Sequence, residues 1–310
     1  MKNSWDLIIS GGGPAGLTAG LYGARSGLKT LIIEKALPGG CINEASYIEN
    51  YPGFPNGISG QELANNMFKQ CENAGAEIHV LERVQKINFR NGKKLVITDS
   101  DEYECEAIII ATGTKYRNLG LPSEVKFRGK GISYCAVCDG PLFKDKEVVV
   151  IGGGNCAAID AIFLSELVSN VTLIHRRDSL RTEKALVEEM KRKNIRVIYN
   201  SEVKRFEGED TLSKVILFNR KSEEFSEIEA QGAFIDIGRI PNIDLVKGSG
   251  IITKDNYIIV DQRQRTNIEG IFAIGDITLS PYKQIGKAIG DAVVAASEAY
   301  GYIKNPYYYR

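Results

Sequence analysis

This sequence lacks a long apolar run, an excess of charge of either sign and a second close pair of cysteines. No stretch approaches the ~18 uninterrupted apolar residues that a bilayer-spanning helix needs. Lysine plus arginine number 39, and aspartate plus glutamate also number 39, so no global field favours nucleic acid or an anionic membrane as a partner. Any basic site must therefore be local.

Cysteine is also sparse, and most of it is isolated. Of six cysteines, only Cys135 and Cys138 are close in sequence, and no charged-then-apolar signal peptide precedes the first apolar run. The sequence therefore predicts a cytoplasmic protein, where structural disulfides are rare. One CxxC with four scattered thiols favours a redox motif over a disulfide framework.

The bulk composition is that of a globular protein with two domains. Hydrophobic residues make up 43% and charged residues 25% of 310 residues, so each domain can bury a core of its own.

A strand, a glycine-rich turn, a helix and a second strand are predicted near the N-terminus. Asp6–Ser10 is a short apolar run that enters Gly11-Gly-Gly-Pro-Ala-Gly16. A helix rich in alanine and leucine should follow to about Ser26, and Lys29–Glu34 should be the next strand. This is a dinucleotide-binding βαβ unit with GxGxxG at its first turn.

The same unit is predicted a second time. Glu147–Ile151 leads into Gly152-Gly-Gly-Asn-Cys-Ala157, a helix should run to about Leu167, and Val171–His175 is the next strand. The interval from the first glycine to the last residue of the second strand is 23 residues in both units. The repeat predicts two dinucleotide sites.

Further elements are expected between the repeats. Residues 83–89 and 93–99 alternate apolar and polar residues around Asn91-Gly92, which predicts a hairpin. Ala107–Gly113 is typical of a buried strand, and a loop should follow from Thr114 to Gly131 because it carries Pro122 and several glycines.

The C-terminal tail should return to the first domain. After Phe234–Gly238 closes the second repeat, Ile271–Asp276 predicts one more strand, and a helix with one apolar face begins at Ile285. The predicted fold is α/β, with two Rossmann-like dinucleotide-binding domains of three-layer ββα type, one inserted in the other. The first comprises residues 1–114 and 245–310, and the second comprises residues 115–244.

The residues after each second strand distinguish the two sites. Glu34 can accept from ribose hydroxyls and disfavours a 2′-phosphate, so the first site suits FAD or NAD. At the matching place the second site has His175-Arg-Arg-Asp-Ser-Leu-Arg181, whose arginines can surround the 2′-phosphate of NADPH. A solvated basic loop is the alternative.

The CxxC carries the redox chemistry. Cys135 and Cys138 can open and close a disulfide with little backbone change, and Asp139 could shuttle a proton to a thiolate. A zinc half-site is disfavoured because zinc needs about four ligands and the chain offers no second CxxC or histidine pair. Cys156 should begin a helix near arginines, which predicts a lowered thiol pKa, with a packing role as the alternative.

Together these residues resemble the low-molecular-weight, bacterial- and archaeal-type NADPH-dependent thioredoxin reductases, and the similarity runs nearly end to end. The segments that carry it are Gly11–Gly16, Glu49–Gly53, Ile110–Gly113, Cys135–Gly140, Gly152–Asn155, His175–Arg177 with Arg181, and Gly275–Asp276. The chain departs from the family's usual pattern at Cys41, where a glutamine near the flavin is typical, and at Cys156, where serine or threonine is typical.

The resemblance implies a flavoprotein that reduces thioredoxin with NADPH, works as a homodimer and needs no metal. Cys138 would face the flavin, Cys135 would attack thioredoxin and Asp139 would be the general acid. The implied FAD contacts are Gly11, Gly13, Pro14, Ala15, Gly16, Glu34, Lys35, Gly40, Cys41, Asn50, Thr112, Gly113, Gly275, Asp276, Lys283, Gln284 and Ile285. The implied NADPH contacts are Gly152, Gly153, Gly154, Asn155, His175, Arg176, Arg177 and Arg181.

Four other functions are alternatives. One is a flavin oxidase of small-molecule dithiols. A ferredoxin-linked relative should lack the arginine cluster, and a peroxide-linked flavoprotein should carry an additional N-terminal CxxC domain. A non-catalytic sensor of the two nucleotides would not require the CxxC followed by Asp139.

Overall fold

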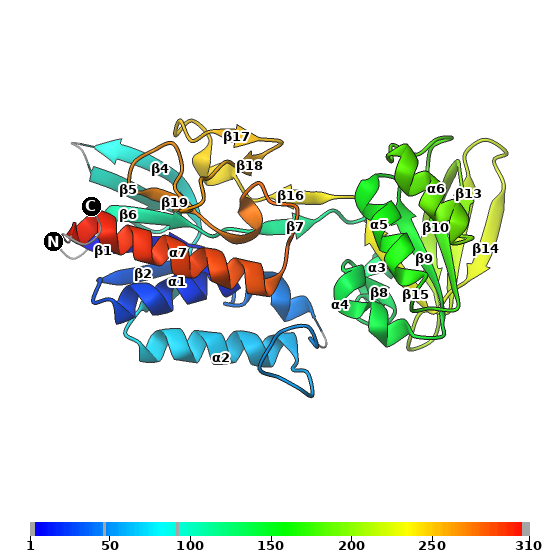
Figure 1. Cartoon of the computed structure of the whole chain (residues 1–310), viewed down its shortest axis with the longest axis horizontal. Helices are drawn as coiled ribbons and strands as arrows, with labels where there is room; N and C mark the ends of the chain where they lie inside the picture. Colours follow the sequence, from blue (N-terminus) through cyan, green and yellow to red (C-terminus); the bar gives the residue numbers. More distant parts are fainter. Residues whose placement is uncertain (1–3, 46–47, 91–92, 306–310) are drawn as a thin grey trace. The chain divides into compact units, whose positions relative to one another are not determined.

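The computed structural model describes residues 4–45, 48–90 and 93–305, which form two compact units (Figure 1). Unit 1 consists of Met1–Tyr47, Tyr51–Lys115 and Ile240–Arg310, and unit 2 of Ile48–Asn50 and Tyr116–Arg239. The predicted turn residues Asn91 and Gly92 lie outside the described residues. Within the described ranges, no helix is both long and apolar enough to cross a membrane.

Unit 1 is built on a sheet that has seven strands among the described residues. The strands β3, β2, β1 and β6 are parallel neighbours in that order, and β5 and β4 continue the sheet antiparallel. The bounds are β1 Ser4–Ser10, β2 Thr30–Glu34, β3 Glu77–Val80, β4 Val84–Arg90, β5 Lys93–Thr98 and β6 Glu102–Ile110. The predicted hairpin is thus confirmed as β4 and β5.

The tail of the chain completes this sheet, as predicted. Strand β19, Ile271–Ala273, pairs in parallel with the second half of β6, and Ile271 lies opposite Ile108. The first half of β6 pairs with β5, so one strand joins residues from three distant parts of the sequence.

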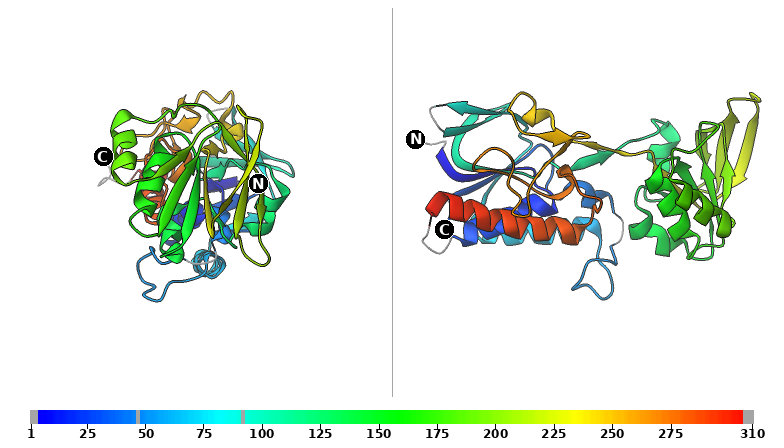
Figure 2. Two further views of the ribbon diagram at one scale, coloured as in Figure 1. Left: turned by 90° about the vertical axis from the view of Figure 1, so that its right-hand side faces the viewer. Right: turned by 45° about the horizontal axis from the view of Figure 1, so that its top comes forward.

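Helices cover one face of the sheet. Helix α1, Pro14–Arg25, lies beside the C-terminal helix α7, Ile285–Lys304, and α2, Gly60–Asn73, packs on α1 (Figures 1 and 2). Alternating residues explain the layers, since Leu7 and Ile9 of β1 face the helices while Ile8 faces the opposite core. That opposite core includes Leu245 and Ile277, from the segment after unit 2.

Unit 2 repeats the architecture on a smaller scale. Its parallel sheet has the order β11-β10-β9-β15-β8, and an antiparallel sheet β12-β13-β14 packs beside it. The strands are β8 Ile132–Ser133, β9 Glu147–Gly152, β10 Asn170–Ile174, β11 Arg196–Ile198, β12 Ser201–Glu207, β13 Lys214–Asn219, β14 Phe225–Glu229 and β15 Gly232–Asp236. The helices are α3 Pro122–Phe127, α4 Ala136–Asp139, α5 Asn155–Leu164 and α6 Lys184–Arg192.

The prediction of an unbroken loop from Thr114 to Gly131 is wrong, because α3 lies within it. Pro122 opens the helix, where a missing N–H costs nothing. The buried carboxylate of Glu124 accepts from the N–H groups of Leu119 (3.2 Å) and Gly120 (2.9 Å), which fixes the entry to the helix.

A two-stranded ribbon carries the chain into and out of unit 2. Strand β7, Thr114–Tyr116, pairs with β16, Arg239–Pro241. The N–H of Arg117 donates to the carbonyl of Gly238 at 3.0 Å, which continues the pairing. The remaining short elements are β17 Thr253–Lys254, β18 Tyr257–Ile258, and the 3-10 turns η1 Gly40–Glu44, η2 Gly140–Phe143, η3 Asp244–Val246 and η4 Gly275–Ile277.

Candidate active site and dinucleotide-binding turns

The glycine-rich turn of unit 1 joins the end of β1 to the start of α1. Gly11 has a φ of +109°, and a Cβ there would lie 2.4 Å from the carbonyl oxygen of Ala111, so the position requires glycine. No described atom lies within 4 Å of the Cβ position of Gly13, the N-cap of α1. The turn therefore leaves open space at the N-terminus of a helix, where a pyrophosphate binds.

Glu34, at the end of β2, holds this turn. Its Oε2 accepts from the N–H of Gly12 at 2.6 Å, and its Oε1 accepts from the N–H of Ala36 at 2.9 Å. Sequence reasoning assigned this carboxylate to a ribose and missed its part in building the turn. Since a carboxylate offers about four acceptor positions, both roles are compatible.

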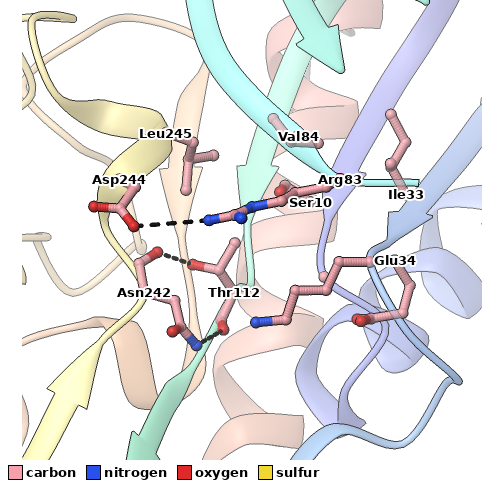
Figure 3. Close-up of a pocket in the computed structure, with 11 residues that line it drawn as sticks. Ser10, Ile33, Glu34, Arg83, Val84, Thr112, Asn242, Asp244 and Leu245 are labelled. Carbon is pink, nitrogen blue, oxygen red and sulfur yellow. Dashed lines mark hydrogen bonds and ion pairs between the residues drawn. The ribbon is translucent and has the colours of Figure 1, made fainter. Parts of the chain in front are cut away.

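A pocket of about 70 Å³ lies beside Glu34 (Figure 3). It is lined by Ser10, Gly11, Ile33, Glu34, Lys35, Arg83, Val84, Thr112, Asn242, Asp244 and Leu245. Thr112 and Asn242 fix one wall, since the Thr112 hydroxyl donates to the Asn242 carbonyl and the Asn242 amide donates to the Thr112 carbonyl, both at 2.8 Å. Lys35 and Thr112 were predicted to contact FAD, whereas Arg83, Val84 and Asn242 were not.

The predicted Gly275–Asp276 segment reaches the same turn from the far end of the chain. A Cβ at Gly275 would lie 3.1 Å from the Cβ of Ala15. Lys283 Nζ donates to the carbonyls of Asp276 (3.0 Å) and Thr278 (2.8 Å). These two bonds tie the backbone of residues 276–278 to the start of α7. Gln284 is the N-cap of α7, and Ile285 begins that helix.

Two other predicted FAD contacts lie at the surface. The Cys41 side chain is exposed, and its thiol donates to the carbonyl of Thr114 at 3.2 Å. Asn50 is exposed and falls in unit 2.

The second glycine-rich turn uses a histidine where the first uses Glu34. His175 is buried, and its Nδ1 lies 2.8 Å from the carbonyl oxygen of Gly152. A Cβ on Gly153 would lie 2.0 Å from the same nitrogen, so the imidazole packs directly under the turn and this position requires glycine. His175 thus contributes to the turn itself.

The arginine cluster lies against this turn. Arg176, Arg177 and Arg181 are exposed, and the backbone N–H of Arg181 donates to the carbonyl of Gly153 at 2.9 Å. Asn155 pairs reciprocally with Glu183, through a side-chain contact of 2.8 Å and a backbone contact of 2.9 Å. Exposed guanidinium groups beside a helix N-terminus fit a phosphorylated ribose.

The CxxC forms a disulfide at the start of α4. Cys135 and Cys138 are bonded, with their Cα atoms 5.3 Å apart. Cys135 is the N-cap of α4, and its sulfur accepts from the N–H of Cys138 at 3.3 Å. Both cysteines are partly exposed, and Val137 between them is 47% exposed, so a protein partner can approach this turn.

Asp139 follows the second cysteine, and its carboxyl is paired with Ser133. The Ser133 hydroxyl donates to Asp139 Oδ2 at 2.6 Å and accepts from the N–H of Cys135 at 3.1 Å. Burial raises the pKa of Asp139 above its usual range, and the hydrogen bond from Ser133 partly offsets this. A carboxyl with a raised pKa that directly follows the second cysteine of a disulfide suits a general acid.

Known proteins match this chain over nearly its whole length. A family model described as pyridine nucleotide-disulphide oxidoreductase matches residues 5–299. The thioredoxin reductase of Treponema pallidum is 41% identical over 98% of both chains. A 34.2 kDa protein in the rubredoxin operon of Clostridium pasteurianum is 42% identical over 96% of this chain and 97% of its own. The crystal structure of thioredoxin reductase from Streptococcus pyogenes superposes with a TM-score of 0.94 at 41% identity, covering 99% and 100% of the two chains.

The chain belongs to the thioredoxin reductases of the pyridine nucleotide-disulphide oxidoreductase family. Thioredoxin reductases combine the two-domain FAD/NAD(P) Rossmann-type fold with a redox disulfide, so the predicted family and fold class are confirmed.

One expectation about this thioredoxin reductase is wrong. The thiol of Cys156 was predicted to have a lowered pKa, but its pKa is raised, first by burial and then by the carboxyls of Asp236 and Asp160. Asp236 ends β15 and Asp160 lies one turn further along α5. Burial and the two acidic side chains therefore outweigh the backbone hydrogen bond and the Arg239 guanidinium, which lower this pKa.

Sequence reasoning also missed residues that hold the thioredoxin reductase site. The buried carboxylate of Asp291 on α7 accepts from the N–H of Gly275 at 3.0 Å and pairs with Lys287. Ser133 holds Asp139 through a hydrogen bond, and Glu183 holds Asn155 in the same way. No sequence signal marks these partners, because each lies in a different element from the motif it supports.

Proposed function

We propose that this chain transfers electrons from NADPH through FAD to the Cys135–Cys138 disulfide and from there to oxidised thioredoxin. The observation that supports this most directly is the disulfide next to Asp139, a partly buried carboxyl with a raised pKa, in a chain that also carries two dinucleotide-binding turns. Full-length relatives that are named thioredoxin reductase support the same reading.

Unit 1 is the proposed FAD site. The open helix start at Gly13 receives the pyrophosphate, Glu34 accepts from the adenosine ribose, and Asp276 holds the ribityl chain. Lys35, Gly40, Cys41, Asn50, Thr112, Gly113, Lys283, Gln284 and Ile285 are the remaining proposed contacts. Bound FAD supplies a two-electron carrier between the nicotinamide and the disulfide.

Unit 2 is the proposed NADPH site. Gly152–Asn155 receive the pyrophosphate, and the exposed guanidinium groups of Arg176, Arg177 and Arg181 bind the 2′-phosphate. His175, buried beneath Gly153, keeps the turn in the shape that the pyrophosphate requires.

The cysteine chemistry then follows from thiol–disulfide exchange. Two electrons and two protons convert the disulfide to a dithiol. The Cys135 thiolate attacks the thioredoxin disulfide to form a mixed disulfide, and Cys138 displaces reduced thioredoxin and restores the Cys135–Cys138 bond. Asp139 protonates the thiolate that leaves when the enzyme disulfide opens.

Anaerobic titration of the FAD-loaded protein with NADPH tests this function. The protein should consume about two equivalents of NADPH, because the flavin and the disulfide each accept two electrons. Mixing with oxidised thioredoxin should then release two thiols per disulfide. Flavin reduction that leaves thioredoxin oxidised would contradict the proposal, and Cys135→Ser is the matched control.

A cytoplasmic location and a homodimer are further parts of the proposal. The scarcity of paired cysteines supports the first, and the resemblance to the family supports the second. Sedimentation of the purified protein at several concentrations would test the dimer.

A further inference from the structure

Four side chains of unit 2 are stacked in a column next to the redox disulfide. The rings of Tyr116 and Tyr134 are stacked, with centroids 4.9 Å apart and planes inclined by 29°. The guanidinium of Arg239 lies 4.3 Å from the centre of the Tyr116 ring, and that of Arg128 lies 4.9 Å from the Tyr134 ring. We call Arg239, Tyr116, Tyr134 and Arg128 the tyrosine column.

Hydrogen bonds fix both hydroxyls of the tyrosine column. Arg239 Nη2 donates to the hydroxyl of Tyr116 at 3.0 Å, and Arg128 Nη2 donates to that of Tyr134 at 3.0 Å. The Tyr134 hydroxyl donates in turn to Glu124 Oε1 at 2.6 Å. Glu124 is buried and also holds the turn before α3, so the column is anchored to a rigid element. Burial and Glu124 raise the pKa of Tyr134 to about 12, so this hydroxyl keeps its proton at working pH.

One member of the column, Tyr134, is joined covalently to a cysteine of the disulfide. Tyr134 directly precedes Cys135, whose Cα is therefore about 3.8 Å from that of Tyr134. Ser133, on the other side of Tyr134, bonds to both Cys135 and Asp139. A ring that stacks on Tyr116, contacts the Arg128 guanidinium and is bonded at its hydroxyl leaves little freedom to the backbone of Cys135.

Two other members of the column, Tyr116 and Arg239, belong to the ribbon formed by β7 and β16. Tyr116 is the last residue of β7 and Arg239 is the first residue of β16. Arg239 also interacts with the carboxyls of Asp160 and Asp236, which restricts its guanidinium further. The column thus connects the ribbon to Tyr134, the residue before Cys135.

We propose that the tyrosine column is a positioning device that holds Cys135 in the geometry needed for attack on its protein substrate. The proposal rests on the proposed function, because it assigns the column to the step in which Cys135 exchanges with thioredoxin. Tyr134 and Tyr116 are positioning residues, since they act through the backbone of Cys135 and touch no reacting atom. A displacement of about 1 Å at a reacting group costs about a hundredfold in rate.

The test compares two electron acceptors in the FAD-loaded full-length protein. NADPH-dependent reduction of ferricyanide takes electrons from the flavin, and thioredoxin takes them from Cys135. Tyr134→Leu and Tyr116→Leu should each lower kcat for thioredoxin about 10- to 100-fold. They should leave ferricyanide reduction and the KM for NADPH unchanged. Tyr134→Phe and Tyr116→Phe keep the stacked rings and should restore most of kcat.

Tyr199→Leu is the matched control, because Tyr199 is an exposed tyrosine of unit 2 outside the column. If Tyr134→Leu fails to fold, Tyr116→Leu still decides, since it removes a ring at the ribbon end. The double leucine variant should lose little more than either single variant, because both remove one column.

Two outcomes would overturn the proposal. Leucine variants that match Tyr199→Leu would remove any role for the column, and equal losses of ferricyanide and thioredoxin reduction would show general damage. A wild-type protein that reduces ferricyanide but not thioredoxin would instead contradict the proposed function.

Discussion

Replacing Ser133 by alanine tests whether Asp139 is the acid that serves the disulfide. The Ser133 hydroxyl donates to Asp139 Oδ2 at 2.6 Å, which stabilises the charged carboxylate and so lowers its pKa. Without that donor, burial acts alone and the pKa must rise further. A hydrogen bond to a charged group contributes about 1.5–3 kcal/mol, which corresponds to about one to two pKa units.

The assay is the pH dependence of the rate at which NADPH reduces the enzyme disulfide in the FAD-loaded protein, from about pH 5 to about pH 10. The rate should fall at high pH, where the acid loses its proton, and this fall is the alkaline limb of the pH profile. In Ser133→Ala the alkaline limb should move to higher pH by about one to two units. The free energy of unfolding should also drop by about 1–3 kcal/mol, because the N–H of Cys135 loses its acceptor at 3.1 Å.

Two variants control this experiment. Asp139→Asn should remove the limb altogether. Ser297→Ala deletes a hydroxyl that donates to the carbonyl of Val293 within α7, in unit 1, and should leave the limb in place. A limb that stays at its wild-type pH in Ser133→Ala would refute the role given to Asp139.

Three further predictions concern the nucleotide and the cysteines. Arg181→Ala should raise KM for NADPH about 10- to 100-fold while the weaker NADH reaction barely changes, since only the 2′-phosphate contact is lost. Arg205→Ala is the control. Equal losses with both cofactors would contradict the assignment of Arg181 to the 2′-phosphate. Cys135→Ser should abolish thioredoxin reduction and leave a long-wavelength flavin absorption from the Cys138 thiolate. Cys138→Ser should lack that band. Swapped spectra would mean that Cys135 faces the flavin and Cys138 attacks thioredoxin. Cys156 should react slowly with iodoacetamide at neutral pH and speed up only at alkaline pH, because its thiol pKa is raised; fast labelling near pH 7 would count against the environment described.

The features that sequence predicted well are those that depend on neighbours in the chain. The first glycine-rich turn was predictable because a buried strand, a turn that only glycine can make and a helix follow one another within Asp6–Arg25. The equal spacing in the second repeat revealed the second turn in the same way. The pairing of β19 with β6 was predictable because the tail is too short for a domain of its own.

The features that sequence missed depend on side-chain contacts that no motif in the sequence marks. Pro122 and nearby glycines suggested a loop, yet Glu124 stabilises a helix through backbone donors that its own turn supplies. The pKa of Cys156 was misjudged because burial raises it and because Asp236 comes from a strand much later in the sequence. The stacking of Tyr116 on Tyr134 has no local signature either, since Tyr116 ends β7 and Tyr134 follows β8.

The insertion of unit 2 sets the order in which the ribosome can complete each fold. Every strand of the five-stranded sheet has been synthesised by residue 236, so unit 2 can fold as soon as β15 has emerged. Unit 1 begins earlier but lacks β19 and α7 until Ile271–Ala273 and Ile285–Lys304 have been made. During that interval one edge of β6 is unpaired and the apolar surface that α7 later covers is exposed. Unit 1 is therefore the part of the nascent chain that most needs protection from aggregation.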